Sequence, residues 1–179
     1  IGTAIIASTG LFAQGKYGAT PADSANCVKN ISLFQESVKQ GSFGDAYGPF
    51  RTLVNVCPAY SKSLYQNGGK MLADFIAKEK DAARKERLID SLMLNYDWRI
   101  ANFGEKAFVL GRKGVDLQYY RPKDCKAAHD ILKESIELGG ARSEPATLNA
   151  YYSALNCQYA EGSVTKEQML SEYVRVSGM

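Results

Sequence analysis

Apolar residues recur every three or four positions along nearly the whole chain beyond Gly18. This spacing places them on one face of a helix, so it predicts helices rather than strands. The pattern breaks at glycine and proline, which divide the chain into helical segments joined by short turns. The expected helices cover about 21–40, 43–57, 60–78, 82–102, 105–121 and 123–138, with a seventh opening at 143–145 and an eighth at 165. The sequence therefore predicts an all-α protein.

The first and last of these helices illustrate how faces and ends are assigned. The first carries apolar residues on one face at Cys27, Ile31, Phe34 and Val38. The last opens with Thr165 and has Gln168 three positions later, which is the pattern of a capping box. Its expected inner face carries Met169, Tyr173 and Val174.

The first pair of helices follows a spacing of 34 residues that is typical of stacked helix pairs. Counted from Cys27 as position one, the consensus positions of such a pair hold Leu33, Gly41, Phe43, Ala46, Phe50 and Pro58. The small Ala46 lets two helices approach closely, the aromatic Phe50 fills their interface, and Pro58 ends the pair. The segment is therefore expected to form an antiparallel helical hairpin.

Three further and looser repeats can be counted from Ser61, Gly104 and about Glu144. With the first, they resemble the tetratricopeptide repeat family, and the resemblance implies an α-solenoid of about four antiparallel helix pairs. Position four of the first repeat is Asn30, where the family has Trp, so the groove chemistry of the family is not transferred to this chain. An irregular helical bundle is the alternative architecture.

The segments 17–24, 27–32, 45–51 and 57–58 resemble, more narrowly, secreted tetratricopeptide proteins of Bacteroidetes-type bacteria. This resemblance covers residues 14–179 and implies a periplasmic or outer-membrane-associated role. It supplies no activity.

The first thirteen residues are apolar and uncharged, and they end in Leu11, Phe12 and Ala13 before Gln14. This is the composition of the hydrophobic region and cleavage site of a secretory signal peptide. We expect residues 1–13 to be the remnant of such a signal and residues 14–179 to be the N-terminal part of a longer mature protein. A buried N-terminal strand or helix is the alternative.

The charge balance limits the kinds of partner that the chain is expected to bind. The chain has 22 Lys and Arg against 19 Asp and Glu, a net charge of +3. This small, scattered excess does not form the basic stripe that nucleic-acid binding requires. The densest charged stretch, 78–87, is interpreted as a solvated turn and helix start. A transmembrane span is not expected, because no apolar run reaches the ~18 residues that a bilayer requires.

The four cysteines are Cys27, Cys57, Cys125 and Cys157. They contain no C-x-x-C pair, and the chain has one His, so a zinc site is not expected. In antiparallel helix pairs Cys27 and Cys57 lie at the same end, and so do Cys125 and Cys157. We therefore expect these two disulfides in an oxidising compartment, with four buried free thiols as the alternative.

An enzymatic candidate exists in Cys125 and His129, four residues apart on one helix face with Asp130 beside them. A disulfide at Cys125 would consume the nucleophile, so we expect neither catalysis nor a cofactor. The aromatic residues, eleven Tyr and Trp98, favour a second alternative in which they stack on sugars. The candidates Tyr151, Tyr152 and Tyr159 are more simply core residues at helical spacing.

The function expected from these patterns is a non-catalytic scaffold or adaptor in the bacterial envelope that binds a protein or peptide, as part of an outer-membrane or secretion-related assembly. Its groove-facing residues would include Gln35, Lys39, Arg112 and Asp116. The alternative function is a carbohydrate-binding, outer-membrane-associated protein built on similar repeats.

Overall fold

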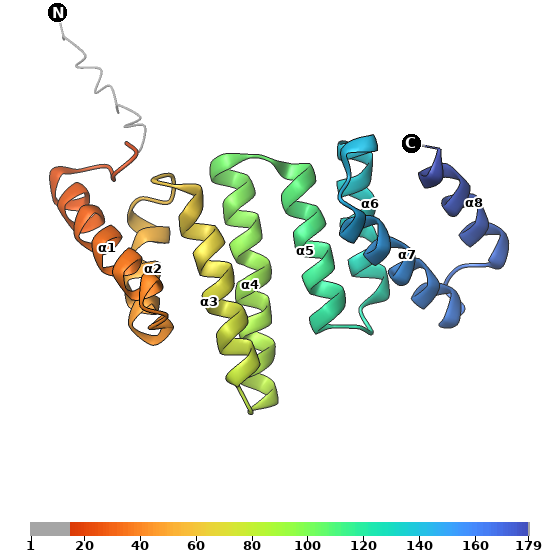
Figure 1. Ribbon diagram of the computed structural model, residues 1–179, viewed down its shortest axis with the longest axis horizontal. Helices are drawn as coiled ribbons and strands as arrows, with labels where there is room; N and C mark the ends of the chain where they lie inside the picture. Colours follow the sequence, from red (N-terminus) through yellow and green to blue (C-terminus); the bar gives the residue numbers. More distant parts are fainter. Residues whose placement is uncertain (1–14, 179) are drawn as a thin grey trace, which may run out of the picture. The chain divides into compact units, whose positions relative to one another are not determined.

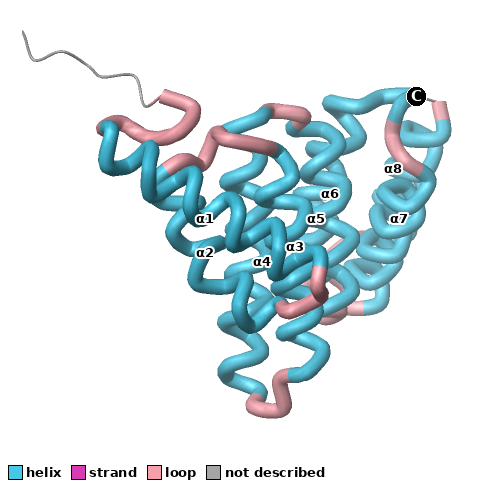
Figure 2. The backbone as a smooth tube through the Cα atoms, turned by 60° about the vertical axis from the view of Figure 1, so that its left-hand side comes forward, coloured by secondary structure: helices cyan, strands magenta, loops and turns pink. Residues whose placement is uncertain are grey.

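The computed structural model describes residues 15–178, which form eight α-helices and one short 3₁₀ helix, without a strand (Figures 1 and 2). The α-helices are α1 (Pro21–Lys39), α2 (Phe43–Val56), α3 (Lys62–Lys78), α4 (Ala82–Phe103), α5 (Lys106–Tyr120), α6 (Cys125–Gly139), α7 (Pro145–Ala160) and α8 (Lys166–Ser177). The 3₁₀ helix η1 (Gly140–Arg142) joins α6 to α7. The predicted all-α class is confirmed for this part of the chain. The expected signal segment, residues 1–13, lies outside the described residues.

Two helices begin with capping boxes, which satisfy backbone N–H groups that have no partner within a helix. At the start of α1, Oγ1 of Thr20 accepts from the backbone N–H of Asp23, and the backbone N–H of Thr20 donates to the Asp23 carboxylate. Pro21 occupies the first turn of this helix. Thr165 and Gln168 do the same at the start of α8, as the sequence predicted.

The chain divides into two compact units between Leu64 and Tyr65. In the first unit, α1 and α2 pack against each other. The rings of Phe34 and Phe50 lie 6.0 Å apart between them, and both side chains are buried. The expected hairpin is present, but Leu33, counted as a consensus position, is 46% exposed and lies on the outer surface.

The second unit contains most of α3 and the five helices that follow. In Figures 1 and 2, α3 and α4 run side by side as an antiparallel hairpin. Helix α5 packs against α4, α6 and α7, and α7 packs against α6 and α8. A continuous apolar core joins these helices, and its buried members include Leu72, Ile76, Ile89, Leu92, Leu132, Ile136, Tyr151 and Leu155.

The inner face expected for α8 is partly wrong. Met169 packs against the core, but Val174 is 75% exposed and Tyr173 is also exposed. Val176 is instead the buried residue of this helix. Position 176 follows 169 by seven residues, about two helical turns, whereas 174 lies some 160° away from 176 around the axis.

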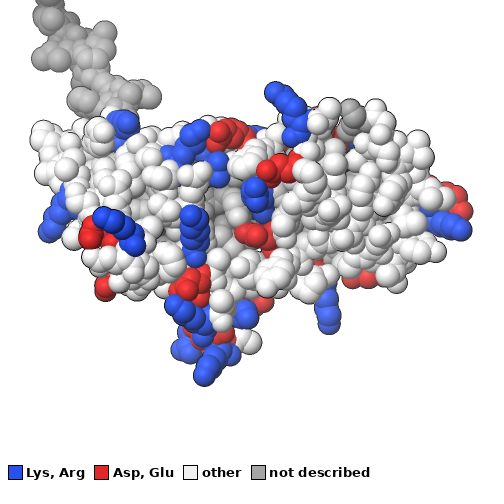
Figure 3. All heavy atoms as spheres, viewed as in Figure 1, with Lys and Arg blue, Asp and Glu red and all other residues white. Residues whose placement is uncertain are grey.

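The charged stretch 78–87 forms the tip of the α3–α4 hairpin. Figure 3 shows blue and red side chains gathered at this tip. Within it, Asp81 caps α4 by accepting from the backbone N–H of Arg84, and Arg84 pairs with Glu79 at 3.1 Å. The interpretation as a solvated turn and helix start is confirmed.

Candidate functional site, a polar groove between α3, α4 and α5

A cavity of about 510 Å³ opens between three helices of the second unit, and we refer to it as the α3–α5 groove. Its lining residues are Tyr65, Gln66, Asn67, Gly69, Lys70 and Ala73 from α3, Asn95, Tyr96 and Arg99 from α4, and Phe108, Arg112 and Asp116 from α5. Most of them are polar, so the groove can offer hydrogen bonds to a bound molecule.

Two buried polar residues of α4, one helical turn apart, are part of this lining. Asn95 is 1% exposed and donates from Nδ2 to the backbone carbonyl of Tyr65 at 2.9 Å. Arg99 is 8% exposed and pairs through Nη2 with Glu105 at 3.1 Å. The Oδ1 atom of Asn95 and the Nε atom of Arg99 are buried without a hydrogen-bond partner. Such atoms are uncommon, because a buried polar atom that lacks a partner destabilises the fold.

The lining of the groove also includes a hydrogen bond between α4 and α5. Tyr96 donates its hydroxyl to Asp116 at 2.6 Å. Burial raises the pKa of Asp116 above its ordinary value, although the bond from Tyr96 and the charge of Arg112 oppose this shift. Burial and the nearby carboxylate raise the pKa of the Tyr96 hydroxyl, which therefore remains protonated at neutral pH. On α3, burial raises the pKa of Tyr65 to about 12.

Phe108 separates the groove from a second cavity of about 330 Å³, because it lines both. The guanidinium groups of Arg99 and Arg112 each lie 5.4 Å from the centre of its ring. Each arginine also pairs with a glutamate of the second cavity, Arg99 with Glu105 and Arg112 with Glu144, both at 3.1 Å. These pairs neutralise both arginines, so the positive charge left in the lining is that of Lys70.

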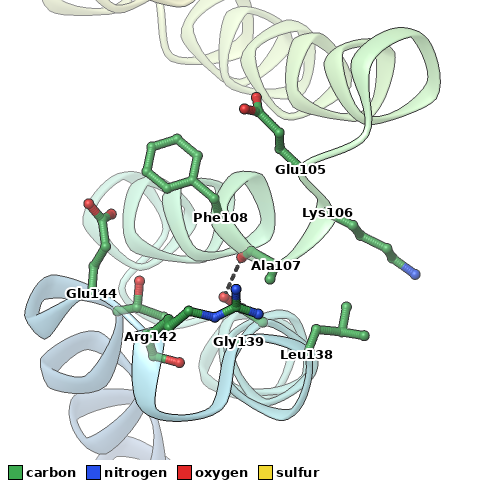
Figure 4. A pocket seen from close by; sticks show the side chains of 11 residues that line it. Glu105, Lys106, Ala107, Phe108, Leu138, Gly139, Arg142 and Glu144 are labelled. Atoms are coloured by element: carbon green, nitrogen blue, oxygen red, sulfur yellow. Dashed lines mark hydrogen bonds between the residues drawn. The ribbon is translucent and has the colours of Figure 1, made fainter.

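The second cavity lies where the start of α5 meets the end of α6 and the start of α7 (Figure 4). Ser135 donates to the backbone carbonyl of Ala107 at 2.6 Å and ties α6 to α5. At Gly111 the helices approach so closely that an added Cβ would lie 2.5 Å from Oγ1 of Thr147 on α7. Helix α5 itself starts from a left-handed residue, Glu105, with φ of 55°.

The residues predicted from sequence to face a binding groove fall into two groups. Arg112 and Asp116 lie one turn apart on α5, and the structure brings both to the α3–α5 groove. Gln35 and Lys39 are exposed on α1, in the first unit. Asn95 and Arg99 were missed, because polar residues within a helical pattern are usually solvated.

The cysteines lie in the predicted pairs. Cys27 and Cys57 have Cα atoms 6.1 Å apart, and Cys125 and Cys157 have Cα atoms 5.7 Å apart, both within the range of a disulfide. Among residues 15–178, one group of side chains could bring ligand atoms together for a metal ion, namely Cys125, Cys157 and Glu161. Its two sulfur atoms are joined to each other, which removes the thiolates that a metal ion would need.

The same pairing affects the enzymatic candidate, Cys125 with His129. With Cys125 bound to Cys157, its thiol is not available as a nucleophile. His129 is buried, its ring stacks on Tyr151 at 4.8 Å, and Nδ1 lies 3.5 Å from Asp130. Burial lowers the pKa of His129 despite the neighbouring carboxylate. These contacts are those of a core histidine.

The aromatic candidates for sugar stacking differ in how deeply they are buried. Tyr151 is fully buried, Tyr152 and Trp98 are half-buried, and Tyr159 is exposed. Tyr152 stacks on Tyr173 with ring centres 3.9 Å apart. The core interpretation holds for Tyr151 and fails for Tyr159, which lies at the end of α7.

Among the described residues, no helix has the length and apolar character needed to cross a bilayer. Comparisons of this chain with protein families, with curated proteins and with solved structures find no match. The function is therefore inferred from the geometry of the molecule.

Proposed function

We propose that this protein is a non-catalytic scaffold that binds a segment of a partner protein in the α3–α5 groove. The observation that carries the proposal is a cavity of about 510 Å³ between three helices, lined mostly by polar residues, in which the buried Asn95 and Arg99 each retain an unused hydrogen-bonding atom. A polar chain segment supplies donors and acceptors to such a groove without needing a reactive group in the protein.

In this proposal the helix pairs of the second unit are repeats of a tetratricopeptide-like solenoid. The packing of α5 against both α6 and α7 supports the stacking of one pair on the next. First helices of successive pairs, here α3 and α5, then contribute to one binding surface. The partner is a subunit of an envelope assembly, at the outer membrane or in secretion, and the protein works by positioning it.

The two cysteine pairs support a location outside the reducing cytoplasm, and we propose the periplasm. Each pair joins the N-terminal half of one helix to the end of the next, so both would stabilise helical hairpins there.

The test uses a bulky side chain at the rim of the groove. Lys70 is exposed and lines the groove, so Lys70→Trp fills its mouth without burying a new group. Lys85→Trp is the matched control, because Lys85 is exposed on α4 outside the groove. Tagged full-length protein is isolated from envelopes, and the proteins that accompany it are quantified. We expect Lys70→Trp to reduce capture of a partner at least tenfold and Lys85→Trp to leave it unchanged. Equal capture by both variants would place the binding surface elsewhere.

A further inference from the structure

Gly69 is a glycine in the middle of α3 that the packing of the free protein does not require. Glycine destabilises a helix interior relative to alanine, so it usually marks a position where a side chain cannot fit. A Cβ at Gly69 would lie 3.6 Å from Nδ2 of Asn95 and 3.8 Å from Cδ1 of Leu92, which are ordinary van der Waals distances. An alanine therefore fits, and the bare backbone at this position needs another explanation.

Gly69 borders the same groove as the two buried atoms without partners. Oδ1 of Asn95 is a hydrogen-bond acceptor and Nε of Arg99 is a donor. The two residues are four apart on α4, so their side chains lie on the same face of the helix. A ligand that satisfies both must offer one donor and one acceptor on the same side.

An extended peptide meets this requirement with a single residue. In a strand, the N–H and C=O groups of one residue point to the same side, as they do in the hydrogen-bonded pairs of an antiparallel sheet. The N–H group can donate to Asn95, and the C=O group can accept from Arg99. A backbone that approaches this closely needs a wall without side chains, which Gly69 provides.

Charge favours main-chain recognition over the binding of an anion. Arg99 is already paired with Glu105, so its unused Nε adds a directed hydrogen bond rather than a free charge. Both atoms are shielded in the free protein, and access requires side chains at the rim to turn aside. Phe108, 42% exposed and in contact with Arg99, is placed to do so.

We infer that the α3–α5 groove binds an extended peptide segment through its backbone, with one residue hydrogen-bonded to Asn95 and Arg99 and lying against Gly69. This inference rests on the proposed function and specifies how the segment is held.

The experiment starts with a probe peptide, selected from a phage-displayed library of random linear peptides on the full-length protein and then synthesised. Its affinity is measured for the wild type, for Gly69→Ala and for Gly44→Ala. Gly44 is the matched control, because it lies within α2, outside the groove, and a Cβ there meets nothing within 4 Å. Both substitutions replace a helical glycine by alanine, so each should raise Tm by about 2–4 °C.

We expect Gly69→Ala to weaken peptide binding at least tenfold while raising Tm, and Gly44→Ala to raise Tm with binding unchanged. Methylation of single backbone nitrogens of the peptide should weaken binding about tenfold or more at one position, because it removes the donor to Asn95. The gain in stability separates loss of binding from loss of folding.

The other outcomes separate the two proposals. If the peptide binds, Lys70→Trp blocks it, and neither Gly69→Ala nor any N-methylation weakens it, the groove binds peptides but backbone recognition is wrong. If no peptide is selected, or Lys70→Trp leaves binding unchanged, the proposed function of the groove fails. Binding of nucleosides in place of peptides, through the same donor and acceptor, would also overturn the inference.

Discussion

The two units of the chain each contain one cysteine pair but differ in how much core surrounds it. In the first unit, the buried apolar side chains are few and belong to one hairpin and the short segment after it, among them Phe34, Phe50 and Leu53. In the second unit, Cys125–Cys157 lies beside a core that joins six helices. Small units bury too little apolar surface to be stable by packing alone. We therefore expect the same covalent link to be a main source of stability in the first unit and an addition to packing in the second.

The largest expected effect is on the first unit. The bond between Cys27 and Cys57 spans 30 residues, so removing it by the double substitution Cys27→Ser and Cys57→Ser should destabilise this unit by about 3–4 kcal/mol. Hydrogen exchange followed by mass spectrometry should show loss of protection throughout α1 and α2 while α5–α7 remain protected. Unchanged protection of α1 and α2 would contradict the importance given to this bond.

The matched change in the second unit is the double substitution Cys125→Ser and Cys157→Ser. This bond closes a loop of 32 residues. The entropy of the unfolded chain then gives a similar loss of about 3–4 kcal/mol in the free energy of unfolding. We expect Tm to fall while α5–α7 keep their protection at room temperature, because the surrounding core remains. If these helices lose protection as completely as α1 and α2 do in the first pair of variants, the contrast between the units is wrong.

A smaller effect is expected where α8 attaches to the second unit. Glu172 accepts hydrogen bonds from Arg175 and Tyr151, and chiefly the bond from Arg175 lowers its pKa to about 2. Because the pKa in the folded state is below the ordinary value, the stabilisation is present above about pH 4.5 and is lost as the pH falls towards 2. Glu172→Gln should therefore destabilise the protein by about 1–2 kcal/mol at pH 7 and by much less at pH 2.

Thermal unfolding across this pH range measures the effect. The control is Glu134→Gln, since Glu134 makes an exposed ion pair with Lys106, and such pairs contribute at most about 0.5–1 kcal/mol. Parallel pH profiles for Glu172→Gln and the wild type would show that Glu172 is not held in this way.

The smallest expected effect is a gain in stability rather than a loss. Burial raises the pKa of Asp116, so the folded protein favours its protonated form and loses stability as the pH rises through that pKa. Asp116→Asn keeps an acceptor for Tyr96 without the charge, and it should raise stability at pH 7 by up to about 1 kcal/mol. Chemical denaturation at pH 7 and pH 3 should show a gain at neutral pH that disappears in acid. Asp97→Asn, which removes an ion pair to Lys113, should give no gain.

The helices could be predicted from the sequence because their signals are local. Pro58 and the capping pair Thr165 and Gln168 end or begin helices through their immediate neighbours. The cysteine pairs could be predicted because two adjacent antiparallel helices bring their outer ends together. Each of these inferences needs only short-range geometry.

The candidate site could be predicted only in part, because it depends on three helices at once. The helical pattern places Arg112 and Asp116 on one face of α5. It does not reveal that Asn95 and Arg99 are buried, because their burial depends on how α3 and α5 pack against α4. Gly69 was the available signal, since a glycine inside a helix indicates a close approach. The opposite mistake occurs at Leu33. The consensus spacing predicted a packed residue there, but the side chain is exposed.

The start of α5 restricts which substitutions the chain can accept. Glu105 adopts a backbone conformation that glycine prefers, and its carboxylate is the partner of the buried Arg99. A substitution to glycine would relieve the backbone and leave Arg99 without its counter-charge, whereas glutamine would weaken the pair and keep the strain. Positions 99 and 105 are therefore expected to change together during evolution, and a sequence that loses the acidic residue should also lose the arginine.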